Sequence, residues 1–273
     1  MKLVWFPTWK CNNYKNNSCP YCPYGWNAEA DSLTFKGEIS SKEGYIKPEI
    51  IKEFFKTNYQ EMEGKIEITG GEPLMYKPLA EVLDSHIKWA ITSNTSIVSA
   101  VEKLINSGAI RRCFSWTASY HFFAHKDREF TQIISMLALN HIDVRVTVVV
   151  SEETLPHLKD IKSFLECLPI KGINWHMETH KGVPEEFRAD AEKIIGPVDW
   201  VAGEIKVNSM CLKRSKLLAL SPGGILYECV THCYTNKDPI CTITPDYELK
   251  ELTPVMELCK DECFACSDWI KHT

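Results

Sequence analysis

The sequence contains no long hydrophobic run, and no segment approaches the roughly eighteen apolar residues of a membrane-spanning helix. Nothing at the N-terminus resembles a signal peptide, because Lys2 is followed by only a short apolar stretch before Pro7 and Lys10. No run of basic residues is present, and the formal net charge is −5 with a pI near 6.0. This acidic balance argues against a nucleic-acid or membrane-binding face. We therefore expect a cytoplasmic protein without membrane or nucleic-acid partners.

Internal repeats and low-complexity segments are also absent, and 273 residues suffice for one medium domain plus a small one. Cysteine, in contrast, is abundant, with 12 residues. In a reducing cytosol, clustered cysteines are more often metal ligands than disulfides. Three lie within residues 11–22 and seven within residues 211–266. The other two, Cys113 and Cys167, lie in apolar segments, where we expect plain core residues.

The N-terminal cysteines form the first candidate metal site. Cys11, Cys19 and Cys22 follow the apolar segment 3–6, which indicates a strand. Four thiolates suit zinc or an iron–sulfur cluster, whereas three on one loop leave a coordination position that a substrate or cofactor can occupy. This open position suggests chemistry at the metal.

A second motif follows the next predicted strand, because residues 66–69 lead directly into Gly-Gly-Glu-Pro at 70–73. Glycines after a strand let the backbone approach a ligand closely. Together the two motifs resemble the radical S-adenosylmethionine (SAM) superfamily, in which a three-cysteine loop follows the first barrel strand and this glycine motif follows the second. The stretch between Cys11 and Cys19 is longer than is usual in the family, but Tyr21 keeps the aromatic position before the third cysteine.

Strand-like and helix-like segments alternate through the first 205 residues. The predicted strands lie near 3–6, 66–69, 87–92, 113–119, 144–150 and 173–177, and the predicted helices near 48–58, 78–85, 96–107, 128–140, 155–168 and 185–195. Six strand-then-helix units imply parallel strands with right-handed crossovers, hence an α/β fold. The resemblance implies a partial (β/α)6 barrel over residues 1–205, with its ligands at the C-terminal edge of the strands.

Polar residues follow several of these strands, and the shared direction of parallel strands should bring them together at the C-terminal end of the barrel: Ser93, Asn94, Ser119, His121 and Glu178. By the resemblance, the backbone of Gly70, Gly71, Glu72 and Pro73 would hold the SAM amino group. Tyr21 would lie beside the adenine, and Ser119 with Arg128 would reach the ribose or the carboxylate. The alternative is that Ser93, Asn94 and Ser119 only cap or form turns.

Residues 206–273 have a different character. Residues 217–220 and 225–227 are the arms of a predicted β-hairpin around a Ser-Pro-Gly-Gly turn. Such a hairpin would bring Cys211 and Cys229 near each other. The predicted domain boundary therefore lies between residues 205 and 206.

Cys263 and Cys266 are separated by two residues, a spacing suited to one metal centre. With Cys211 and Cys229 they resemble the "twitch" extension of radical SAM enzymes, a shortened SPASM domain of small α+β structure that holds one auxiliary [4Fe–4S] cluster. A structural zinc site is the alternative. Three further cysteines remain unassigned and are alternatives for one of the four ligands: Cys233, Cys241 and Cys259.

The activity that the resemblance implies is radical chemistry on SAM. A [4Fe–4S] cluster on the N-terminal cysteines would bind SAM, and one electron from a donor such as flavodoxin or ferredoxin would cleave it to methionine and a 5′-deoxyadenosyl radical. That radical would abstract a substrate hydrogen. An auxiliary cluster could then accept a second electron, which describes an oxidoreductase. Candidates for the proton-accepting base are His121, His176 and Glu178. The alternative for either histidine is a structural role, and the alternative for Glu178 is a solvated or salt-bridged carboxylate.

The substrate class stays open at this level. The first strand begins at about residue 3, which leaves no room for the leader-binding domain of peptide maturases and favours a small molecule. A peptide maturase and an epimerase are alternatives within the family. A non-enzymatic, zinc-stabilised binding protein is the alternative outside it.

Overall fold

The computed structural model describes residues 1–13, 24–27, 32–35, 38–39, 45–83, 86–124, 126–177, 185–197, 209–213, 217–252 and 255–259. Its main feature is a nine-stranded sheet with the order β13-β12-β11-β1-β5-β6-β7-β8-β9. Six of these strands are successive parallel neighbours: β1 (Lys2–Trp5), β5 (Lys65–Ile68), β6 (Lys88–Ser93), β7 (Cys113–Tyr120), β8 (Val144–Val150) and β9 (Gly172–Met177). The predicted partial (β/α)6 barrel is confirmed.

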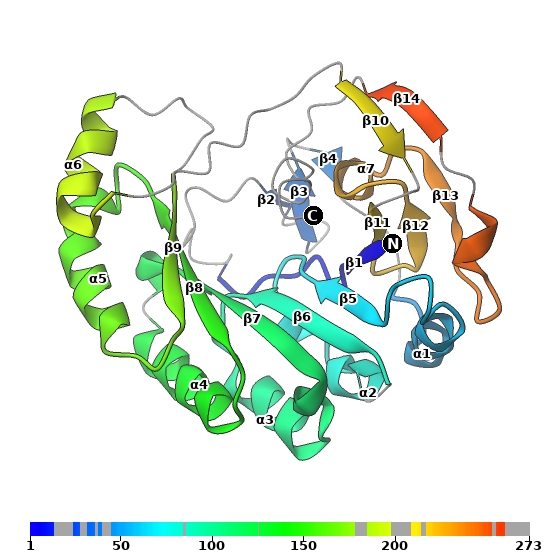
Figure 1. Ribbon diagram of the computed structural model, residues 1–273, viewed down its shortest axis with the longest axis horizontal. Coiled ribbons are helices and arrows are strands. Elements are labelled where there is room, and N and C mark those ends of the chain that lie inside the picture. The colour runs from blue at the N-terminus through cyan, green and yellow to red at the C-terminus, as the bar shows by residue number, and fades with distance from the viewer. Residues whose placement is uncertain are drawn as a thin grey trace.

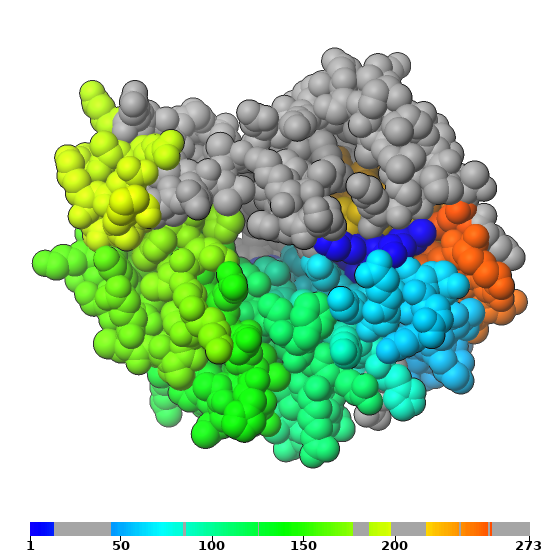
Figure 2. Space-filling model, in the orientation of Figure 1, coloured from blue at the N-terminus to red at the C-terminus, as the bar shows by residue number. Residues whose placement is uncertain are grey.

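A helix follows each of these strands along the chain, and the helices line the outer side of the curved sheet (Figure 1). They are α1 (Pro48–Thr57), α2 (Leu79–Leu83), α3 (Val98–Asn106), α4 (Asp127–Leu139), α5 (Leu158–Glu166) and α6 (Glu185–Ile195). Short 3₁₀ turns span Pro73–Met75, Ala109–Arg112, Phe122–Ala124, Leu155–His157 and Leu249–Glu251. In Figure 2 the segments from α1 to α6, coloured cyan to yellow-green, pack side by side.

Alternation along the strands separates the helix-covered face from the concave face. In β8 the valines at 144, 146, 148 and 150 are buried, whereas Arg145 is exposed and Thr147 half-buried. The buried face packs on apolar stripes of the helices, such as Ile51, Phe54 and Phe55 of α1. Burial of these β-branched and aromatic side chains supplies the main driving force for the barrel.

Local signals set several element boundaries. Pro48 occupies the first turn of α1, and Gly108 ends the turn after α3 with φ +80° and an N–H donated to the Ile105 carbonyl at 3.0 Å. Cys113 is buried as predicted, but the prediction for Cys167 is wrong. Cys167 follows the last turn of α5, off its apolar stripe, and its exposed thiol donates to the Ser163 carbonyl at 3.2 Å.

The predicted hairpin is present as β11 (Leu217–Leu220) and β12 (Ile225–Tyr227), paired antiparallel. β11 also pairs in parallel with β1, and β13 (Pro239–Thr242) extends the sheet beyond β12. Side chains of the hairpin, including Leu218 and Leu220, belong to the same core as the barrel. The hairpin therefore continues the barrel sheet, and the division at residues 205 and 206 stays a prediction.

Several smaller elements lack a counterpart in the predicted set. A three-stranded antiparallel sheet contains β2 (Tyr24–Asn27), β3 (Ser32–Phe35) and β4 (Glu38–Ile39). A two-stranded ladder joins β10 (Ser209–Lys213) to β14 (Val255–Cys259), and α7 (Val230–Thr235) follows β12. Within the described ranges, no helix is both long and apolar enough to cross a bilayer.

Candidate cofactor site

The segment that leads to Cys11 lies directly on the glycine motif. Gly71 N donates to the Thr8 carbonyl at 3.1 Å, and Glu72 N donates to the Lys10 carbonyl at 2.7 Å. A Cβ atom on Gly71 would lie only 2.4 Å from Lys10 O. The close backbone approach that the glycines permit is therefore made by the cysteine-bearing segment itself.

Gly70 has φ +138°, a conformation that other residues rarely adopt, and a Cβ there would lie 2.6 Å from Thr8 O. The N–H group of Gly71 is already used by this segment. The carbonyl oxygens of Gly70 and Gly71 accept no hydrogen bond from the residues that the structure describes. These two carbonyls are suited to accept from an amino group.

The Glu72 side chain is fully buried and joins the turns that follow β5 and β6. Its Oε1 accepts from Ser93 Oγ at 2.8 Å and from Leu74 N at 3.0 Å, and its Oε2 accepts from Asn94 N at 2.7 Å. Burial raises the pKa of Glu72 to about 7, although these donors and the Lys126 charge pull it down. Glu72 and Ser93 thus hold the edge of the barrel together, and Pro73, also buried, begins the next turn.

Asn94 connects this edge to the cysteine segment. Its side chain is 8% exposed, and its Nδ2 donates to Asn12 Oδ1 at 2.7 Å and lies 4.0 Å from Cys11 Sγ. Cys19, Cys22 and Tyr21 lie outside the described residues. Among the described side chains, no three His, Cys, Asp or Glu groups form a metal-binding cluster.

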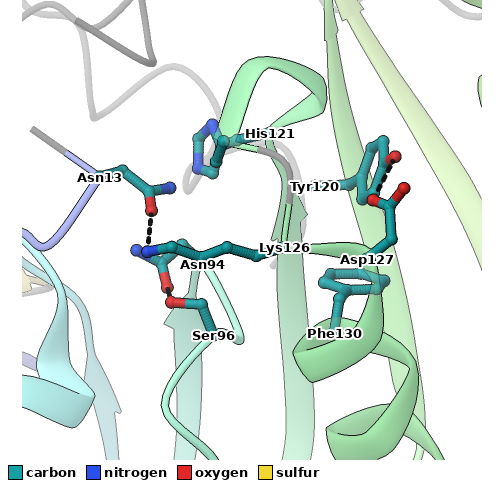
Figure 3. A pocket seen from close by; sticks show the side chains of 9 residues that line it. Asn13, Asn94, Ser96, Tyr120, His121, Lys126, Asp127 and Phe130 are labelled. Carbon is teal, nitrogen blue, oxygen red and sulfur yellow. Dashed lines mark hydrogen bonds between the residues drawn. The ribbon is translucent and has the colours of Figure 1, made fainter. Parts of the chain in front are cut away.

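A small polar pocket lies beside Asn94, between the ends of β6 and β7 (Figure 3). It is lined by Asn13, Asn94, Ser96, Tyr120, His121, Ala124, Lys126, Asp127 and Phe130. Lys126 Nζ donates to Asn13 Oδ1 at 3.0 Å, and Tyr120 Oη donates to Asp127 Oδ1 at 2.8 Å. Its enclosed space is about 10 Å³, room for about one water molecule. The pocket therefore supplies polar groups at this edge of the barrel rather than room for a whole ligand.

The predicted base candidates are distributed around the barrel. His121 lines the pocket, and desolvation together with the Lys126 charge lowers its pKa to about 4, so its imidazole is neutral at pH 7. His176 lies in β9, in register with Val149 of β8. Two strand spacings of about 4.8 Å separate the backbones of β7 and β9 at this level, roughly 10 Å. Glu178 lies outside the described residues.

Ser119 and Arg128 do not line the pocket. Ser119 is half-buried on β7, paired with Thr147, and Arg128 is exposed in the first turn of α4. The cation in the pocket is instead Lys126, which the sequence analysis missed. Its position one residue before the acidic start of α4, close after the Ser-Tyr-His segment, could have drawn attention to it.

The C-terminal cysteines differ in their surroundings. Cys229 caps α7, and its Sγ accepts from His232 N at 3.4 Å, whereas Cys233 is 1% exposed in an apolar cluster. Cys241 is half-buried against the main core. Cys211 lies in β10, where its backbone alone is described. Cys259 lies on the paired strand β14, and Cys263 and Cys266 fall outside the described residues.

No protein-family model matches the sequence, and no curated protein shows significant similarity to it. Solved structures do match. SuiB from Streptococcus suis bound to SAM aligns with a TM-score of 0.54 at 14% identity, covering 87% of this chain and 60% of SuiB. Native anSMEcpe with bound AdoMet aligns with a TM-score of 0.57 at 13% identity, covering 90% of this chain and 78% of anSMEcpe.

The chain has the fold of the radical SAM enzymes. SuiB bound to its precursor peptide SuiA shares this fold as well, with a TM-score of 0.57 at 13% identity and coverage of 87% of this chain and 61% of SuiB. The chain thus spans about three fifths of the length of SuiB. At these identities the radical SAM likeness establishes architecture alone. In the structure itself, Cys11 and the polar pocket lie at the C-terminal edge of the strands, where parallel α/β barrels carry their sites.

Proposed function

We propose that the chain is a radical SAM enzyme in which Cys11, Cys19 and Cys22 hold a [4Fe–4S] cluster. The observation that carries the proposal is the position of Cys11 at the C-terminal edge of the barrel, 4.0 Å from the Asn94 amide and next to a polar pocket. When bound, the cluster and SAM together supply one-electron chemistry that ends in abstraction of a substrate hydrogen.

The described residues fit the amino-acid end of SAM. The Gly70 and Gly71 carbonyls can accept from its amino group, because the cysteine segment uses the N–H group of Gly71 and no described residue donates to these two oxygens. Lys126 presents an ammonium group inside the pocket, positioned through its hydrogen bond to Asn13. A carboxylate placed there gains a charge-assisted hydrogen bond. We therefore assign the carboxylate contact to Lys126 rather than to Arg128.

His121 is better suited to hydrogen bonding than to proton abstraction. A general base works best with a pKa near the operating pH, whereas the pKa of His121 is lowered to about 4. Its neutral ring can donate from one nitrogen and accept at the other, as a ribose or an adenine requires. The proton acceptor for substrate oxidation would then be His176 or Glu178.

We further propose an auxiliary cluster on Cys211, Cys229, Cys263 and Cys266. Cys229 is supported as a ligand because its sulfur accepts a backbone N–H, which favours a thiolate. The buried apolar setting of Cys233 and the packing of Cys241 against the core support structural roles for both. Such a cluster would accept the second electron when the substrate is oxidised.

The substrate would be a small molecule or a peptide. Dehydrogenation of a small molecule is the first candidate, in which the auxiliary cluster would accept the second electron. The structure of SuiB with a precursor peptide favours the second candidate, a peptide-modifying enzyme. A low-potential donor such as flavodoxin or ferredoxin would supply the electron in either case.

Anaerobic reconstitution with iron and sulfide tests the proposal. Two clusters correspond to about eight irons per chain, and dithionite should drive cleavage of SAM to 5′-deoxyadenosine. Replacement of Cys11, Cys19 and Cys22 together by alanine should remove about half of the iron and all SAM cleavage. Stoichiometric zinc without iron after reconstitution would overturn the proposal in favour of a zinc-stabilised binding protein.

A further inference from the structure

Three polar side chains beside Cys11 form a closed ring of hydrogen bonds. Asn94 Nδ2 donates to Asn12 Oδ1 at 2.7 Å, Asn12 Nδ2 donates to Ser96 Oγ at 2.9 Å, and Ser96 Oγ donates to Asn94 Oδ1 at 2.5 Å. The Ser96–Asn94 contact is visible in Figure 3. Reversal of one amide alone would set two donors or two acceptors against each other. Reversal of both would restore the ring but turn the Asn94 amide oxygen toward Cys11 Sγ, an acceptor when it is a thiolate. The ring and the Cys11 sulfur together therefore fix the orientation of both asparagines.

The ring is anchored to the barrel from behind. The backbone N–H of Asn94 donates to the buried Glu72 carboxyl at 2.7 Å, and Glu72 in turn accepts from Ser93 Oγ at 2.8 Å. Asn94 is therefore held by the turn after β5 as well as by its own turn after β6. Since Asn12 belongs to the cysteine segment, the ring joins that segment to two barrel strands.

One donor of Asn94 remains outside the ring. An amide NH₂ group has two hydrogens, and one is used for Asn12. Nδ2 also lies 4.0 Å from Cys11 Sγ, within reach of the large sulfur atom. The fixed amide orientation keeps this N–H directed at a thiolate that the proposed cluster would need as a ligand.

We propose that Asn94 is a positioning residue that orients the Cys11 thiolate and raises the reduction potential of the cluster it ligates. The inference rests on the proposed function, because it presumes a cluster on Cys11. A donor to a ligating sulfur withdraws negative charge and so favours the reduced, more negative cluster. Because Asn94 is buried, little water competes with that donor. Asn94 would thus act on the cluster rather than on SAM.

Redox titration of the reconstituted full-length chain, followed by electron paramagnetic resonance of the reduced cluster, tests this role. In Asn94→Leu, which keeps the volume and removes the amide, the reduced-to-oxidised ratio at the parent's midpoint should fall at least threefold; a tenfold fall corresponds to about 59 mV. Ser96→Ala is the matched control, because it opens the ring but keeps the Asn94 donor. Its ratio should fall by less than that of Asn94→Leu.

Other outcomes separate the possibilities. An unchanged midpoint in Asn94→Leu with full iron content overturns the inference, and if SAM affinity alone falls, Asn94 is a SAM ligand instead. If Asn94→Leu does not fold, Asn94→Ser, which also lacks the amide donors, takes its place with the same expected shift. A parent protein that shows no [4Fe–4S] signal refutes the proposed function itself, before any variant is compared.

Discussion

Gly71→Ala gives the sharpest test of how the glycine motif supports the cysteine segment. The added Cβ would lie 2.4 Å from Lys10 O and 2.5 Å from Trp9 O, distances that real Cβ atoms do not show. Both partners are backbone atoms, so relief requires movement of the segment that leads to Cys11. That movement disrupts the bonds from Gly71 N to Thr8 O at 3.1 Å and from Glu72 N to Lys10 O at 2.7 Å.

Two lost backbone hydrogen bonds cost roughly 1–3 kcal/mol, which corresponds to a fall in the apo-protein's Tm of about 2–12 °C at this chain length. Displacement of Cys11 should also reduce iron loading. Gly172→Ala is the matched control, because a Cβ at that position meets nothing within 4 Å. Calorimetry and iron analysis measure both effects. Full iron content and an unchanged Tm in Gly71→Ala would refute the steric reasoning and favour a glycine that serves only the ligand.

Three further predictions follow from single side chains. Lys126→Met should weaken SAM binding roughly 10–100-fold, as measured by calorimetric titration, because a charge-assisted hydrogen bond is lost. Unchanged SAM binding in Lys126→Met, or equal weakening in Arg128→Met, would contradict the assignment of the carboxylate contact to Lys126. Because the pKa of Glu72 is raised from 4.5 to about 7, its contribution to stability is greatest below pH 4.5 and declines up to about pH 7. Glu72→Gln should therefore remove the fall in Tm between pH 4.5 and pH 7, and an unchanged fall would show that another group titrates. Cys229→Ala should lower iron content by about half, whereas Cys233→Ala should destabilise the fold and keep the iron; the reverse pattern would exchange their roles.

Much of the barrel could be predicted because its signals are local. The valine alternation of β8 and the proline and glycine at the ends of α1 and α3 are readable in a few consecutive residues. The hairpin of β11 and β12 was equally readable from its turn. The parallel pairing of β11 with β1 could not be predicted, since it joins residues more than 200 positions apart and leaves no local pattern.

The site was less predictable because its residues depart from usual tendencies. A glutamate is rarely fully buried, and the sequence assigned Glu72 only a backbone role, whereas three donors make the burial of its side chain possible here. The ring around Asn94 depends on Asn12, a residue 82 positions away. Only the tertiary fold brings these partners within hydrogen-bonding distance. The position of Asn94 after a strand thus predicted that it lies at the edge of the barrel, but not what it contacts.

The sheet order also explains how the two cysteine-rich regions belong to one packed unit. β1 lies between β5, which leads to the glycine motif, and β11, which begins the hairpin before Cys229. On its concave side, Phe6 and Trp9 pack against Tyr234 of α7, with ring centroids 5.0 and 5.5 Å from that tyrosine. Trp9 precedes Cys11 by two residues, and α7 begins directly after Cys229. Aromatic packing therefore restrains the position of one cysteine segment relative to the other, which a flexibly tethered C-terminal domain would not do.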